Sequence, residues 1–138
     1  MDFEIELNKV KFDEYDEADL EMLYEFIERI EKLPNKRDAI PAIFNFMEES
    51  HDKELGSPGP LVHFVEEKND YHKALKESLT RKPTVLTLWM VNRIINGVSE
   101  ADKIDWFSTL ETVSSNESAD EMAKAEAKRY LEYQRGEI

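Results

Sequence analysis

The segment from Val85 to Asn96 constrains the fold most, because apolar residues occupy every side of the helix that it would form. A helix that is hydrophobic all round is normally buried. Pro83 and Thr84 precede the segment and Gly97 follows it, which are typical signals for the start and the end of a helix. We therefore predict a central, buried helix over residues 85–96, with Trp89 in the core.

The preceding residues show helical spacing of apolar positions between clear stop signals. Residues 16–33 predict an acidic first helix, whose apolar stripe is Leu20, Leu23, Ile27 and Ile30. A second helix is expected to start at Asp38, which would cap it. Pro41 then falls in the first turn, where a missing N–H costs little. The run Gly56–Pro60 predicts a loop, and two short helices follow it.

Residues 99–138 predict two C-terminal helices. Ser99 would cap the first, and its inner face would be formed by Ile104, Trp106, Phe107 and Leu110. The spacing of Ser118 and Glu121 is that of a capping box and predicts the start of the last helix. One side of that helix would carry Met122, Ala123, Tyr130 and Tyr133.

The N-terminal residues differ, since apolar and polar side chains alternate from Phe3 to Phe12. A period of two favours a strand, and without a second strand it predicts an extended arm over residues 1–14. Together these patterns predict an all-α single domain over residues 1–138. It would be a compact bundle of six or seven short helices, in which helix pairs could stack as hairpins, with residues 38–97 as a scaffold.

Length and composition set the class of protein. A chain of 138 residues with 41% hydrophobic residues can bury one core. No cysteine is present, which excludes disulfides, thiolate zinc sites and cysteine nucleophiles. The N-terminal residues lack the pattern of a signal peptide, and no apolar run approaches the ~20 residues that span a bilayer. We expect a cytoplasmic protein.

Acidic residues are concentrated at one end. The net charge is −13, and the first 33 residues hold twelve carboxylates against four cations. Such a field repels nucleic acid and anionic membranes and attracts basic partners. The candidate partner-binding residues are Asp13, Glu14, Asp16, Glu17, Asp19 and Glu21. Solubility and the preference of carboxylates for helix N-termini are the alternative explanation.

No catalytic, cofactor or metal site is predicted. Glu48 and His51 have the Glu-x-x-His spacing of di-metal bundles, but the further pairs that such sites need are missing. His63 is interpreted as a buried or loop-bracing histidine. Asn92 and Arg93 interrupt the apolar helix, and we interpret them as a structural pair whose partner could be the Gly56–Pro60 loop.

The segments 55–63, 81–84 and 89–96 (LGSPGPLVH, RKPT and WMVNRIIN) support a resemblance. Over residues 38–97, the chain resembles small helical immunity proteins of bacterial polymorphic-toxin and contact-dependent inhibition systems. The resemblance implies a non-enzymatic antitoxin that binds and blocks one cognate toxin domain, a basic nuclease being a plausible target. It identifies no contact residues, so we place the contact on the acidic N-terminal third, outside the matching segment. Two alternatives are a helical adaptor for another basic protein and a small metal-dependent enzyme. No pattern specifies an oligomeric state.

Overall fold

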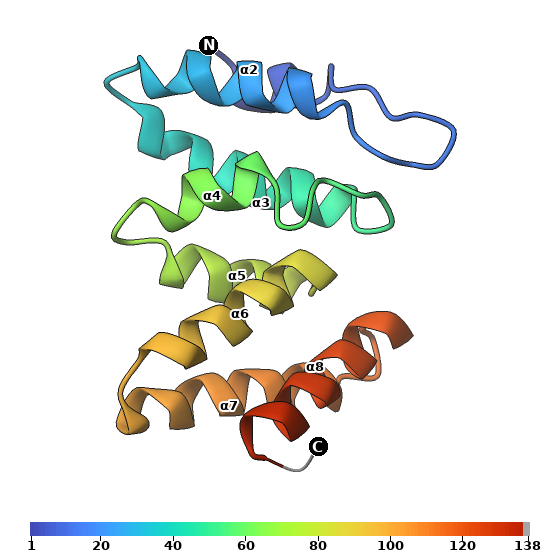
Figure 1. Cartoon of the computed structure of the whole chain (residues 1–138), viewed down its shortest axis with the longest axis vertical. Coiled ribbons are helices and arrows are strands. Elements are labelled where there is room, and N and C mark those ends of the chain that lie inside the picture. The colour runs from blue at the N-terminus through green and yellow to red at the C-terminus, as the bar shows by residue number, and fades with distance from the viewer. Residues whose placement is uncertain (137–138) are drawn as a thin grey trace. The chain divides into compact units, whose positions relative to one another are not determined.

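The computed structural model describes residues 1–136 and confirms an all-α fold (Figure 1). This part of the chain contains eight α-helices, one more than predicted, and one 3₁₀ helix. Only isolated β-bridges occur in it, with no strand. The elements are α1 (Phe3–Leu7), α2 (Leu20–Glu31), η1 (Lys36–Asp38), α3 (Ala39–Glu49), α4 (Pro60–Glu66), α5 (His72–Arg81), α6 (Val85–Gly97), α7 (Glu100–Ser114) and α8 (Glu121–Gln134).

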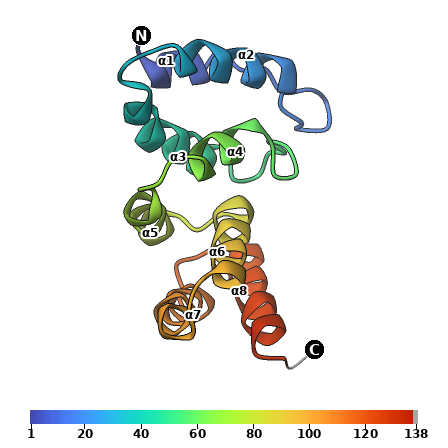
Figure 2. The ribbon, with the colours of Figure 1, turned by 60° about the vertical axis from the view of Figure 1, so that its left-hand side comes forward.

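The helices form two compact units, which divide within α5. The first comprises Met1–Leu75 and the second begins at Lys76. In the first unit, α1 packs on α2 and α3, and α2 packs on α4. In the second, α6, α7 and α8 pack on one another (Figure 2). That the chain folds as one cooperative domain stays a prediction.

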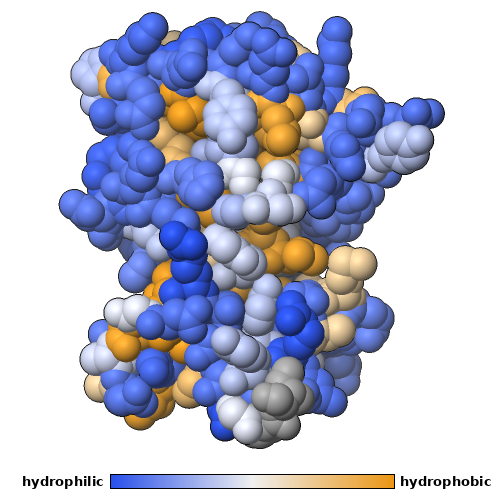
Figure 3. Space-filling model, viewed as in Figure 1, coloured by the Kyte–Doolittle hydropathy of each residue, from blue (hydrophilic) through white to orange (hydrophobic). Residues whose placement is uncertain are grey.

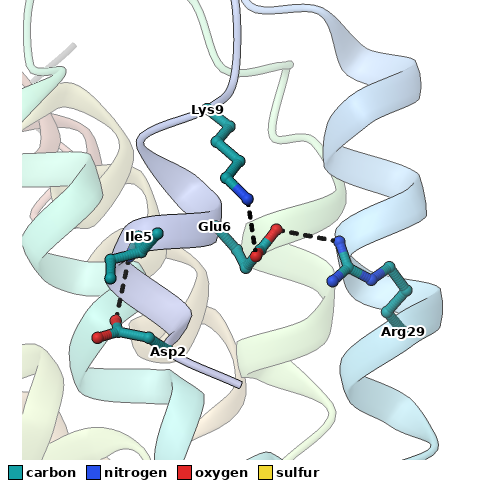
Figure 4. Close-up of polar contacts among 5 residues, drawn as sticks. All are labelled: Asp2, Ile5, Glu6, Lys9 and Arg29. Atoms are coloured by element: carbon teal, nitrogen blue, oxygen red, sulfur yellow. Dashed lines mark hydrogen bonds and ion pairs between the residues drawn. The ribbon is translucent and has the colours of Figure 1, made fainter.

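The additional helix is α1, and the predicted extended arm is wrong for residues 3–7. The carboxylate of Asp2 accepts a hydrogen bond from the Ile5 N–H at 3.1 Å and caps this short helix (Figure 4). Leu7 is buried, whereas Ile5 is 56% exposed. Phe3 and Leu7 are four residues apart, a spacing that suits a helix and a strand equally. The exposure of Ile5 shows which period the chain adopts.

The core of the first unit follows the predicted stripe of α2 in part, since Leu23 and Ile30 are buried and Ile27 is half-buried. α2 buries Leu23, Phe26 and Ile30, and α3 buries most of its side chains. Residue 20 departs from the predicted stripe, because Leu20 is 41% exposed. Asp38 does stand at the N-cap of α3, but its side chain makes no capping hydrogen bond because it belongs to η1.

The central helix of the second unit is less symmetrically buried than the sequence predicts. α6 begins after Thr84, which forms a capping box with Thr87. Leu88, Val91 and Ile95 of α6 are fully buried, as predicted. Trp89 is only half-buried, so its predicted burial is wrong. Trp106 of α7 is the buried tryptophan, at 4% exposure.

The two C-terminal helices also contain corrections. Ser99 caps α7 as predicted, by accepting a hydrogen bond from the Asp102 N–H. Ile104, expected in the core, is 71% exposed. The residue at the N-cap of α8 is Asp120, so the predicted Ser118–Glu121 capping box does not form. On α8, Ala123, Ala127, Tyr130 and Leu131 are buried, whereas Met122 and Tyr133 are exposed.

Candidate functional site

Five of the six candidate acidic residues lie on the loop between α1 and α2, and Glu21 lies in the first turn of α2. Figure 1 shows this loop projecting beyond the start of α2. Backbone hydrogen bonds fix it. The Ala18 N–H donates to the Glu54 carbonyl at 2.8 Å, and the Glu54 N–H donates to the Asp16 carbonyl at 2.9 Å. The Asp19 N–H also donates to the Lys11 carbonyl at 2.8 Å. The loop is therefore ordered although it is highly charged.

Side-chain contacts also hold this loop in place. The ring of Phe12 stacks on that of Phe46, with centroids 6.4 Å apart. Lys53 lies 5.9 Å from the centroid of the Phe12 ring and forms an ion pair with Asp16 at 3.1 Å. The hydrogen bond to Asp16 raises the pKa of Lys53 above its usual value. One of the acidic candidates thus has a cationic partner within the protein.

Two further candidates have structural roles. The Asp13 carboxylate accepts hydrogen bonds from the Tyr15 and Glu17 N–H groups, at 2.8 and 3.0 Å. This turn is tight, and Asp16 within it adopts a positive φ of 60°. The Asp19 carboxylate caps α2 by accepting from the Met22 N–H at 3.2 Å. Replacing these aspartates would therefore disturb the fold, and the position of Asp19 agrees with the alternative that carboxylates favour helix N-termini.

The remaining three candidates are glutamates that face the solvent. Within residues 1–136, the side chains of Glu14, Glu17 and Glu21 are exposed and make no hydrogen bond or ion pair. Tyr15, beside Glu14, is 75% exposed. The structure thus divides the six predicted residues into three structural aspartates and three uncompensated glutamates.

Two other carboxylates of the N-terminal third, Glu6 and Glu31, form ion pairs with nearby cations. Glu6 lies between Lys9 and Arg29, each 3.1 Å away, and hydrogen bonds from Lys9 and then Arg29 lower its pKa (Figure 4). Glu31 pairs with Lys68 at 2.9 Å and with Lys36 at 3.4 Å. The hydrogen bond from Lys68 is the largest cause of the lowered pKa of Glu31.

The residues considered for other chemistry lie elsewhere. Among residues 1–136, no three His, Asp or Glu side chains are grouped to hold a metal ion. His63, predicted to be buried or to brace a loop, is exposed on α4. The amide oxygen of Asn92 accepts a hydrogen bond from Gln134 of α8 at 2.7 Å, rather than bonding the predicted loop. Arg93 is exposed and lies over the Trp89 ring, 5.3 Å from its centroid.

No helix within residues 1–136 combines the length and the apolar character needed to cross a membrane. We found no match between the chain and known protein families, characterised proteins or solved structures. The interpretation of the acidic surface therefore depends on its own residues. The sequence alone could not separate paired from unpaired carboxylates. It also did not predict that the Tyr15 side chain is exposed beside them.

Proposed function

We propose that this chain is a cytoplasmic, non-enzymatic immunity protein that binds and neutralises a cognate bacterial toxin domain, a nuclease with a basic surface. The observation that supports it is the set of uncompensated glutamates on an ordered loop and the adjoining helix start: Glu14, Glu17 and Glu21. The resemblance over residues 38–97 points to the same class of protein.

The physical argument concerns the rate of association. Nucleases bind phosphate with cationic surfaces, and a carboxylate surface can occupy them in place of the nucleic acid. Charge complementarity accelerates encounter, which matters for an inhibitor that must capture a lethal enzyme quickly. An ordered loop also loses little conformational entropy when it binds.

On this proposal we expect the neighbouring upstream gene to encode the toxin, and the direct test is co-expression of that protein with this chain. We expect growth to stop when the toxin is expressed alone and to recover when this chain is present. Loss of growth in both cultures would contradict the proposal. Binding of that protein without recovery of growth would instead favour an adaptor.

The contact surface is tested with two variants of equal charge. Glu14→Lys/Glu17→Lys changes the candidate surface, and Glu77→Lys/Glu117→Lys changes exposed glutamates of the second unit. All three aspartates that support the fold remain in place. We expect the first variant to associate with the toxin about tenfold more slowly or worse, an effect that falls as salt rises. Equal rates for both variants would remove the contact from this loop.

A further inference from the structure

The exposed flank of α2 carries apolar side chains that the core buries only in part. Leu20, Tyr24 and Ile27 are spaced i, i+4 and i+7, so they form one stripe along the helix. We call these three residues the α2 stripe. Leu20 is 41% exposed and Tyr24 is 54% exposed, while Ile27 is half-buried. The core of the first unit is contacted by a different face, formed by Leu23, Phe26 and Ile30.

Glutamates border the α2 stripe on its solvent side. Tyr24 lies one turn from Glu21 and one turn from Glu28, and Glu25 is the next exposed residue. Within residues 1–136, these three glutamates have no side-chain hydrogen bond or ion pair. Like charges three or four residues apart on a helix repel each other.

The combination differs from an ordinary exposed leucine, which needs no explanation. Figure 3 shows hydrophobic surface at the level of α2, with hydrophilic residues above it and on its left and right. An apolar centre with a charged rim is the usual anatomy of a protein interface, and tyrosine is enriched among the residues that dominate binding energy. The negative charge of the bordering glutamates favours a partner with cationic residues.

We propose that the α2 stripe is the anchor of a docking surface for a protein whose apolar patch is bordered by lysine and arginine. This inference rests on the proposed function and deepens it, because it assigns separate roles to charge and to apolar contact. The glutamates accelerate encounter, whereas burial of the Tyr24 ring slows dissociation. The partner is a folded protein with a cationic surface. A surface that carries lysines without neighbouring apolar side chains would not bind the α2 stripe.

A defined probe tests this chemistry without the toxin. It is a helical peptide of about 18 residues, five turns, with leucine on one face and lysine on the other. Its control has the same lysines with glutamine in place of leucine. Titration into the isotopically labelled full chain, followed by amide chemical shifts, should shift Leu20, Tyr24 and their helical neighbours with the leucine peptide.

Matched tyrosine variants give the decisive comparison. Tyr24→Ala should weaken binding of the leucine peptide about tenfold, whereas Tyr133→Ala, which alters a tyrosine of 57% exposure on α8, should change it less than about twofold. Tyr24→Phe should bind like wild type, since the ring supplies the contact. Circular dichroism should show all three variants folded, because the substituted side chains are largely exposed.

Three results of the peptide experiment would overturn the inference. They are equal binding of the two peptides, an unchanged affinity in Tyr24→Ala, and shifts confined to residues outside α2. The proposed function fails on a different result, namely the absence of growth recovery with the toxin. If Tyr24→Ala restores growth and binds the toxin with wild-type affinity, the immunity function stands but the α2 stripe is not its anchor.

Discussion

Gly59→Ala should destabilise the first unit severely, although it adds a single methyl group. Gly59 adopts a φ of +93°, and a β-carbon there would stand 2.2 Å from the Leu55 carbonyl oxygen. That oxygen is a backbone atom next to a side chain that is only 2% exposed, so it cannot rotate away. The unfavourable backbone conformation costs about 1–3 kcal/mol and the overpacking a similar amount. We expect a loss of about 3 kcal/mol or more.

The matched control is Gly97→Ala. Gly97 ends α6, and a β-carbon there would meet nothing within 4 Å. Alanine is the better helix former, so this variant should be neutral or more stable by up to ~1 kcal/mol. Urea unfolding followed by far-ultraviolet circular dichroism measures both free energies of unfolding. If the two variants differ by less than about 0.5 kcal/mol, the reasoning from the loop geometry is wrong.

Three further predictions follow from burial, charge and unit structure. Trp106→Ala should lower the free energy of unfolding by about 3–5 kcal/mol, clearly more than Trp89→Ala, because Trp106 is buried and Trp89 is only half-buried. Denaturant titration of both variants measures this, and a larger loss in Trp89→Ala would contradict the prediction. The folded-state pKa of Glu31 is lowered, so its ion pair with Lys68 stabilises the fold above about pH 4.3 and is lost as the pH falls through the folded pKa. The stability gap between wild type and Glu31→Gln should therefore close in acid, and a gap that widens there would contradict the assignment. Both tryptophans lie in the second unit, so tryptophan fluorescence reports on the unfolding of that unit only. If the chain is one cooperative domain, fluorescence and circular dichroism should give the same urea midpoint, and Gly59→Ala should shift both midpoints. Separate midpoints would show two domains.

Local physical chemistry within the sequence determined most of the secondary structure. Apolar residues at helical spacing identified Leu23 and Ile30 of α2 as buried, and Ser99 and Gly97 marked helix ends that the structure confirms. These signals act over one or two turns, so no knowledge of distant residues is needed to read them. The concentration of acidic residues near the N-terminus is likewise visible in the sequence alone.

Contacts between distant residues decided the rest. Residues 3–7 are helical where Arg29 of α2 pairs with Glu6 and Asn45 of α3 donates a hydrogen bond to Glu4, and neither partner is visible in the local pattern. Burial of Trp106 rather than Trp89 depends on which face of each helix meets its neighbours. Asp16 and Glu31 are paired by lysines 37 residues away, whereas Glu14, Glu17 and Glu21 are not paired within the described chain. The sequence determined how much charge this end carries, and only the fold decided which part of it remains for a partner, because ion pairing depends on distance in space and not along the chain.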